Sequence, residues 1–288
     1  MEYCSRPFRS VLYVPGSNQR ALEKSKSLSA DGFILDLEDA VAPDRKREAR
    51  DSVADALRYG GFENRTAMVR INGHESPWYD ADLDRICGAE PEAILLPKVN
   101  SGSDVRRLED DLGRRECEAF IWAMMETPLG ILNASGIASS SSRLAGFVLG
   151  TNDLAKDLGS RSLPDRSPLA ASLGIALLAA KSQSLICIDG VYNAFRDSDG
   201  FARECEQGRD YGFDGKSLIH PAQIEAANLA FAPSAEELEL ARKQVAAYEQ
   251  AERDGRGVAV LDGRIVENLH VESAKRIIAK AASIARLR

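Results

Sequence analysis

The sequence predicts an α/β protein, a TIM (β/α)8 barrel that carries a C-terminal helix-hairpin-helix extension. Eight short apolar runs rich in β-branched residues alternate with longer segments of helical periodicity. This alternation is typical of parallel strands joined by helices. The chain has 288 residues, a length at which an α/β barrel forms one domain. We expect the catalytic barrel over residues 1–232 and the extension over residues 233–288.

The expected elements follow one another in the order that a barrel requires. The strands are Ser10–Val14, Gly32–Asp36, Ala67–Ile71, Ala93–Pro97, Ala119–Met125, Gly146–Gly150, Leu185–Asp189 and Gly215–Ile219. The helices between them include Arg20–Ser29, Asp44–Arg58, Val105–Leu112, Leu169–Gln183, Phe201–Tyr211 and Ala222–Ala230. We expect Asp44 and Ser103 to be N-caps, because short polar side chains accept hydrogen bonds from the free amides of a first turn.

An open, doubly wound sheet is the alternative to a barrel. That fold class carries a G-x-G-x-x-G turn after its first strand, whereas PGSNQR stands at this point of the chain. The count of eight strand-helix units also favours a closed sheet.

The pattern changes after Phe231. We expect a charged helix over Ser234–Arg253, a hairpin in the segment VAVLDGRIV and an amphipathic helix over Glu272–Arg286. A segment of this size is too small to bury a core of its own. It should therefore dock on the barrel or on a neighbouring subunit.

Composition and charge exclude several classes of protein. The chain is 44% hydrophobic and 28% charged, as ordinary globular proteins are. A net charge of −7 and a pI near 5.2 leave no broad basic surface, which argues against nucleic acid or an anionic membrane as partner. No run approaches the ~20 apolar residues that span a bilayer. The start MEYCSRPFRS also lacks the apolar region of a secretory leader.

Cysteine usage predicts a reducing compartment. Cys4, Cys87, Cys117, Cys187 and Cys205 are odd in number and include no C-x-x-C pair. Neither a disulfide framework nor a zinc site is indicated. We expect buried thiols and a cytoplasmic location.

Charged residues stand at the C-terminal ends of most predicted strands, where barrel enzymes build their active sites. They are Asp36, Glu38 and Asp39 after the second strand, Arg70 after the third, Lys98 after the fourth, Glu126 after the fifth, Asp153 after the sixth and Asp189 after the seventh. Carboxylates gathered at one mouth repel one another unless cations compensate them. The pattern therefore predicts a cation in the site.

Oxygen ligands without a Cys/His cluster favour magnesium, or manganese, over zinc. Spacing alone does not decide which two carboxylates hold the ion. Glu126 and Asp153 follow adjacent strands and could meet on one side of the mouth. The alternative is that each is a helix cap or an ion-pair partner.

Arg70 lies within VRIN at a strand end, where an arginine can clamp a carboxylate with two parallel hydrogen bonds. It could bind a substrate carboxylate, neutralise Glu38 or Asp39, or do both. We expect Lys98 to be an ion-pair residue and His220 to be a capping or packing residue.

Basic residues near the first two helices could hold phosphates. They are Arg20, Lys24 and Lys26 on the first helix, and Arg45, Lys46 and Arg47 after the segment LDLEDAV.

Nine segments, in order across nearly the whole chain, resemble the citrate lyase β-subunit-like family of the HpcH/HpaI aldolase superfamily. They are RSVLYVPGS, ILDLEDAVAPDRK, VRINGHESPW, ILLPKV, METPLGILNA, LGTNDLAKDLGS, IDGVYNAFRD, GFDGKSLIHPAQI and GVAVLDGRIVENLH. Within the family, GTNDLAK, DGVYNAF, ECEQGRDYGFDGK and DGRIVENLH look most like the branch that hydrolyses (3S)-malyl-CoA.

The resemblance implies a magnesium ion on Glu126 and Asp153, with Arg70 on the acyl carboxylate. It places coenzyme A along the first strand-helix unit, at the positions of Tyr13 and Lys24. A basic residue of a lyase relative is replaced here by Asn18, and Arg20 could take over that phosphate contact. We also expect Asp36, Glu38 and Asp39 to contact and orient the residues that bind the metal and the substrate. The resemblance also implies assembly into trimers or hexamers.

The tail departs from the lyase pattern. Lyases of the family carry an aspartate in a motif like GRMID on a segment that covers the site of a neighbouring subunit. Here Glu267 fills that position, and one added methylene moves a carboxylate by about 1.5 Å.

We therefore expect hydrolysis of malyl-CoA to malate and coenzyme A, with Glu267 as general base. The alternatives are a lyase for malyl-CoA, citramalyl-CoA or β-methylmalyl-CoA, or a citrate lyase β-type subunit.

Overall fold

The computed structural model describes residues 6–62 and 64–287. Eight parallel strands form a closed barrel in sequence order, and β1 pairs with β8 to complete it. The strands are β1 (Ser10–Pro15), β2 (Gly32–Asp36), β3 (Thr66–Arg70), β4 (Ala93–Leu96), β5 (Phe120–Met125), β6 (Leu144–Leu149), β7 (Ile186–Asp189) and β8 (Gly215–Leu218). The predicted (β/α)8 barrel is confirmed.

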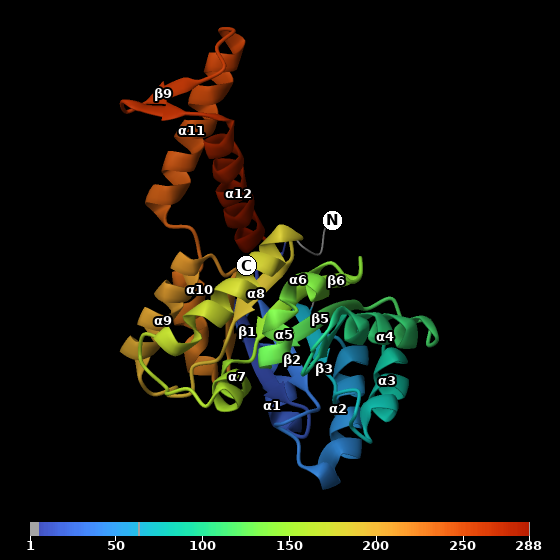
Figure 1. Cartoon of the computed structure of the whole chain (residues 1–288). Coiled ribbons are helices and arrows are strands. Elements are labelled where there is room, and N and C mark those ends of the chain that lie inside the picture. The colour runs from blue at the N-terminus through green and yellow to red at the C-terminus, as the bar shows by residue number, and fades with distance from the viewer. Residues whose placement is uncertain (1–5, 63, 288) are drawn as a thin grey trace. The chain divides into compact units, whose positions relative to one another are not determined.

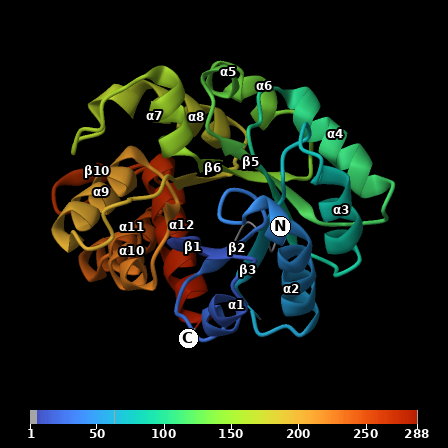
Figure 2. The same cartoon turned by 90° about the horizontal axis from the view of Figure 1, so that it is seen from below.

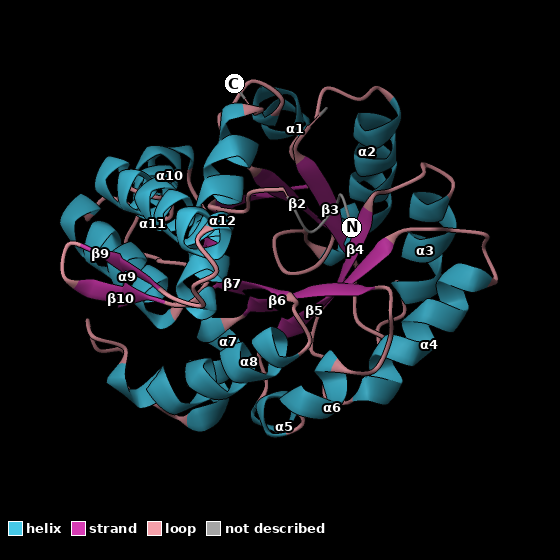
Figure 3. Ribbon diagram, turned by 90° about the horizontal axis from the view of Figure 1, so that it is seen from above, coloured by secondary structure: helices cyan, strands magenta, loops and turns pink. Residues whose placement is uncertain are grey.

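Helices surround the strands, as Figure 1 and Figure 3 show. They are α1 (Gln19–Ser25), α2 (Lys46–Arg58), α3 (Tyr79–Cys87), α4 (Gly102–Gly113), α5 (Pro128–Leu132), α6 (Ala134–Ala138), α7 (Thr151–Leu158), α8 (Ala170–Ser182), α9 (Ser198–Tyr211) and α10 (Ile224–Ala230). Figure 2 shows α1, α2, α3 and α4 following one another around the outside of the barrel.

Alternation along the strands divides the core into two parts. In β2, Phe33 and Leu35 pack outward into the cluster shared with the helices, where they join Val53 of α2. Ile34 and Asp36 lie between them in sequence and so face the barrel interior. Because the interior is filled with side chains, the barrel is a packed core, and its C-terminal mouth is where an active site can form.

Two of the expected helix caps are wrong. Asp44 lies inside a 3₁₀ turn, Pro43–Arg45, that precedes α2, because a proline favours the first position of a helical turn. Ser103 lies inside α4, whose N-cap is Ser101. The carboxylate of Asp104 accepts a hydrogen bond of 2.9 Å from the backbone N–H of Ser101 and so occupies the cap.

The structure divides into two compact units, Phe8–Phe231 and one that contains Ala232–Arg288. The second unit consists of α11 (Ala235–Arg253), the hairpin β9 (Ala259–Leu261) and β10 (Arg264–Val266), and α12 (Asn268–Ala285). Asp262 and Gly263 form the turn with φ of 50° and 74°, the geometry that Asp-Gly hairpins adopt. The predicted helix-hairpin-helix extension is present.

The hairpin has one buried and one exposed face. Ala259 and Val266 pack with Ala251 and Val271 into a small cluster. Their neighbours Val260 and Ile265 are cross-strand partners and are 68% and 61% exposed.

No helix within the described residues is long and apolar enough to cross a membrane. Cys87, Cys117, Cys187 and Cys205 are buried free thiols, as expected. Cys4 lies outside the described residues.

Candidate active site

Arg70 joins the ends of β2 and β3 at the barrel mouth. Its Nε and Nη2 donate to the two carboxylate oxygens of Asp36 at 2.7 and 2.6 Å, and Nη1 lies 3.1 Å from Glu38. Asp39, an expected partner, is 3.8 Å away and mostly exposed. The two-pronged clamp is therefore made with Asp36, which is the register partner of Arg70 in the sheet.

Burial and charge act against each other in this pair. Burial alone would raise the pKa of Asp36, but the attraction and hydrogen bonds of Arg70 outweigh it and lower that pKa. The pKa of Arg70 is raised, because the attraction of Asp36 outweighs the opposing effect of burial. Both groups are held in their charged forms.

Tyr13 lies beneath Arg70. The guanidinium carbon is 5.0 Å from the centre of the Tyr13 ring, and the phenol contacts the Met124 sulfur at 3.9 Å. Burial raises the pKa of Tyr13, so the phenol is neutral. Tyr13 thus belongs to the mouth of the barrel.

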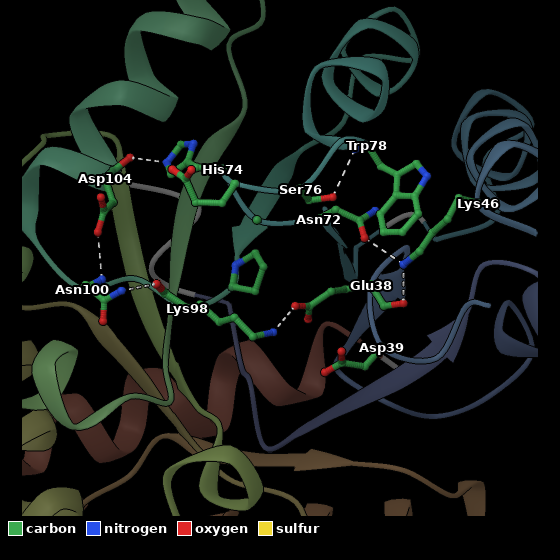
Figure 4. A pocket seen from close by; sticks show the side chains of 13 residues that line it. Glu38, Asp39, Lys46, Asn72, His74, Ser76, Trp78, Lys98, Asn100 and Asp104 are labelled. Carbon is green, nitrogen blue, oxygen red and sulfur yellow. Dashed lines mark hydrogen bonds and ion pairs between the residues drawn. The ribbon is translucent and has the colours of Figure 1, made fainter. Parts of the chain in front are cut away.

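Lys98 connects the acidic loop after β2 with Glu126. Its Nζ forms an ion pair with Glu38, which Figure 4 shows from close by. Its backbone N–H donates to Glu126 Oε1 at 2.7 Å. The expectation that Lys98 is an ion-pair residue is confirmed, whereas its backbone contact with Glu126 was not foreseen.

Glu126 is fully buried at the end of β5. Burial, and next the negative charge of Glu38, raise the pKa of Glu126 to about 8. Its Oε2 has no hydrogen-bond partner within the part of the chain that the structure describes. A Cβ at Gly150 would lie 2.5 Å from this oxygen, so the glycine leaves room beside it.

Asp153 lies in the first turn of α7, three residues beyond Gly150. Its strand, β6, is the neighbour of β5, and Leu149 is in register with Met125. The Asp153 side chain is 33% exposed and 4.0 Å from Lys156. Among the described residues no group of three His, Cys, Asp or Glu side chains forms a ready metal cage. A site here would have two carboxylates and open positions, which suits magnesium.

Lys46 has a role that the sequence did not reveal. It is buried, and its Nζ donates to Leu37 O, Glu38 O and Asn72 Oδ1, each at 2.7 Å. The expectation that Lys46 holds phosphates is wrong, because its three N–H groups are used within the barrel. Lys46 thereby fixes the loop that carries Glu38. The one feature of the sequence that could have indicated this role is the position of Lys46 shortly after LDLEDAV.

A cavity of about 500 Å³ opens beside these residues (Figure 4). Glu38, Lys98, Lys46 and Trp78 line it, and the Lys46 ammonium lies 5.0 Å from the Trp78 ring centre.

The first helix carries two of the basic residues that are expected to hold phosphates. Arg20 and Lys24 are exposed on α1, in its first and last turns. Asn18 caps the helix by accepting a hydrogen bond of 3.1 Å from the N–H of Ala21. Asn18 therefore has a structural role here.

Two further predictions concern His220 and Glu267. His220 accepts a hydrogen bond of 3.2 Å from the N–H of Ala222, so the expected capping role is confirmed. Glu267 precedes α12 in the second unit, where its backbone N–H donates to His270 Nδ1 at 3.1 Å. The Glu267 side chain is exposed.

The HpcH/HpaI aldolase/citrate lyase family matches residues 9–221, which span the barrel and its mouth. The chain belongs to this family. Among its relatives, a (3S)-malyl-CoA thioesterase of Cereibacter sphaeroides is 53% identical over 99% of this chain and 98% of its own length. The citrate lyase subunit beta of Escherichia coli is 34% identical over 96% of this chain and 94% of its own length.

A solved structure of the family has the same fold over nearly the whole chain. CitE from Mycobacterium tuberculosis, in complex with magnesium, acetoacetate and coenzyme A, superposes with a TM-score of 0.79 at 28% identity. The match covers 96% of this chain and 98% of that one.

Proposed function

We propose that this protein hydrolyses (3S)-malyl-CoA to malate and coenzyme A in a magnesium-dependent reaction. The observation that carries the proposal is the full-length identity of 53% to a (3S)-malyl-CoA thioesterase, against 34% to a citrate lyase β subunit. The barrel mouth supports the proposal, because it carries two carboxylates that could hold a metal ion, Glu126 and Asp153, and an arginine that could bind the carboxylate of a hydroxy acid, Arg70.

Glu126 and Asp153 fit magnesium. The buried Glu126 oxygen without a partner, the space at Gly150 and the raised pKa of Glu126 all indicate a carboxylate that lacks a cation. The relative CitE is described as a magnesium complex. When bound, the ion would orient the hydroxyl and carboxylate of the malyl group and polarise the substrate.

Arg70 would hold the substrate carboxylate. Asp36 occupies Nε and one N–H of Nη2, and Nη1 pairs with Glu38, so a substrate carboxylate would compete with Glu38 for the Nη1 edge. That edge lies beside Glu38 and Met124. The pairing of Glu38 with Lys98 reduces the repulsion that an incoming carboxylate would meet.

Glu267 would act as general base. It accepts a proton from water as the water oxygen attacks the thioester carbonyl. The carbon-sulfur bond then breaks, the coenzyme A thiolate takes up that proton from Glu267, and the new carboxylic acid releases its own proton to solvent. The exposed apolar pair Val260 and Ile265 beside Glu267 supports docking of the hairpin on a neighbouring copy in a homotrimer or homohexamer.

Coenzyme A would lie along the first strand-helix unit, with Tyr13 at the acyl end and Arg20 and Lys24 toward the phosphates. The exposure of both basic side chains on α1 is consistent with this. The buried free thiols support a reducing, cytoplasmic location.

A product assay tests the proposal directly. Purified protein is incubated with (3S)-malyl-CoA and magnesium, and every product is identified by mass. We expect malate and free coenzyme A in equal amounts, with no turnover after chelation and recovery on adding magnesium. Glu126→Gln, which removes a charged ligand, is the control and should be inactive but folded. Release of acetyl-CoA and glyoxylate would instead establish the lyase alternative.

A further inference from the structure

A second cavity, between the loops that follow β6 and β7, has no part in the function proposed above. Its volume is about 510 Å³, within the range of small-molecule sites. Thr151 and Asn152 line it, so it adjoins the first turn of α7 that carries Asp153. Leu163, Pro168 and Val191 give it an apolar part. The cavity is large enough for an organic molecule.

Arg166 gives the cavity a fixed, buried cationic group. The residue is 7% exposed, and its Nη1 donates to both oxygens of Asp189 at 2.7 and 2.8 Å. Its Nε donates to Gln207 Oε1 at 2.8 Å. Its Nη2 is buried without a hydrogen-bond partner among residues 6–62 and 64–287. Such an unsatisfied guanidinium N–H is costly, and an anion would satisfy it.

The carboxylates near Arg166 are already compensated. Lys216 is fully buried and donates to Asp189 at 2.9 Å and to Glu204 at 2.8 Å. Two cations, Arg166 and Lys216, therefore face two carboxylates, and this group of four is neutral. It does not repel an anion in the cavity.

The remaining charges of the cavity are positive in sum. Arg161 and Arg203 line it, against the single further carboxylate of Asp197. That carboxylate accepts hydrogen bonds from the Tyr192 hydroxyl at 2.7 Å and from the Gly200 N–H at 2.9 Å. Arg161 forms no ion pair within the described part of the chain. Two arginines against one carboxylate leave an excess of one positive charge.

We propose that this cavity binds an organic oxyanion, a carboxylate or phosphate carried on an apolar or planar body. Arg161, Arg166 and Arg203 would receive the anionic group, and the side chains of Leu163, Pro168 and Val191 would contact the body. The site is separate from Glu126 and Asp153, and it does not depend on the reaction proposed for them. Because Asn152 and Asp153 are consecutive, a ligand here lies next to the candidate active site.

Binding measured by titration calorimetry on the full chain, with chelator present, tests the proposal. The probes are adenosine 3′,5′-bisphosphate, (S)-malate and inorganic phosphate. The three probes distinguish three sources of the anionic group: a nucleotide phosphate, a free dicarboxylate and inorganic phosphate alone. We expect one of the two organic probes to bind with Kd below about 1 mM. The double variant Arg161→Gln with Arg203→Gln should weaken that binding by at least about 10-fold.

The matched control is Arg209→Gln, which removes one positive charge from the same helix, α9. Arg209 pairs with Asp210 and does not line the cavity, so binding should be unchanged. Glu126→Gln should likewise bind the probe as the parent does. Loss of binding in Glu126→Gln, equal binding by the double variant and the parent, or inorganic phosphate binding as tightly as the organic probe would each overturn the proposal. So would the failure of both organic probes to bind.

Discussion

Arg70 and Glu126 differ in how their charges are compensated, although both end strands at the same mouth. Arg70 is matched by Asp36 and approached by Glu38. Glu126 receives one backbone N–H from Lys98 and leaves its second oxygen unpartnered among the described residues. The site thus has one carboxylate that lacks a cation and one arginine whose charge is shared between two carboxylates.

Replacement of Arg70 by Lys tests its substrate role. The ammonium keeps the charge but cannot hold Asp36 with two hydrogen bonds and still present an N–H edge to a ligand. We expect the catalytic efficiency kcat/KM for malyl-CoA to fall by at least about 10-fold, equivalent to about 1.4 kcal/mol. Steady-state kinetics with excess magnesium measures this. Unchanged kinetics would show that Arg70 serves only to neutralise the acidic loop.

Replacement of Gly150 by Ala tests the space beside Glu126. The new Cβ would lie 2.5 Å from Glu126 Oε2, so the carboxylate must move or the strand end must shift. We expect magnesium to be needed at a concentration at least about 10-fold higher for half-maximal activity. Gly174→Ala in α8 is the matched control, since its Cβ would meet no atom within 4 Å. Equal magnesium requirements in both variants would argue against a metal at Glu126.

At the scale of single elements, the strands could be predicted from the sequence, whereas the N-caps expected at Asp44 and Ser103 were wrong. The apolar runs fix where each strand lies, and β2 was predicted to the residue. Helix starts depend on local competition, such as Pro43 opening a 3₁₀ turn ahead of α2. The pairing of Asp36 with Arg70 requires the register between β2 and β3, which the sequence does not supply.

The elements β7, β8 and α9 are joined by the buried group of Asp189, Glu204, Lys216 and Arg166. Asp189→Asn would leave Lys216 and Arg166 with Glu204 as the one remaining carboxylate of this group, so one buried positive charge would be uncompensated. Breaking a buried ion pair in this way costs about 3–5 kcal/mol, which urea denaturation would detect. Asp210→Asn on the exposed face of α9 is the control and should change stability by less than about 0.5 kcal/mol. Similar midpoints for both variants would contradict this account.

The contribution of Asp189 should also depend on pH. Burial would raise its pKa, but the attraction of Lys216 and Arg166 outweighs burial and lowers it. A carboxyl with a depressed pKa stabilises the fold fully above its unfolded pKa of about 3.9. That stability is lost as pH falls through the folded pKa. The difference in unfolding free energy between parent and Asp189→Asn should therefore be constant from pH 5 to 8 and shrink below about pH 4.

At the scale of the whole molecule, ordered motifs from Arg9 to His270 predicted the family, and the family match over residues 9–221 confirms it. The barrel mouth gathers residues from six strand ends, an arrangement that the predicted topology implies. Glu267 lies beyond the residues that the family match covers. It lies in a separate compact unit, and the packing of the small cluster around Val266 concerns that unit alone.

The proposal that Glu267 serves the site of a neighbouring copy leads to a quantitative test. Glu126→Gln and Glu267→Gln subunits should each be inactive, the second while still binding malyl-CoA. If each site combines Glu126 of one copy with Glu267 of the next, random assembly of the two variants in equal amounts makes about one quarter of the sites complete. Co-expression with different tags and purification of mixed oligomers should therefore recover about a third of the parent activity for a homotrimer and about a quarter for a homohexamer. If Glu267 serves its own copy, no mixed oligomer contains a complete site, and the mixtures should remain inactive. Parent-level activity of Glu267→Gln alone would remove the base role as well.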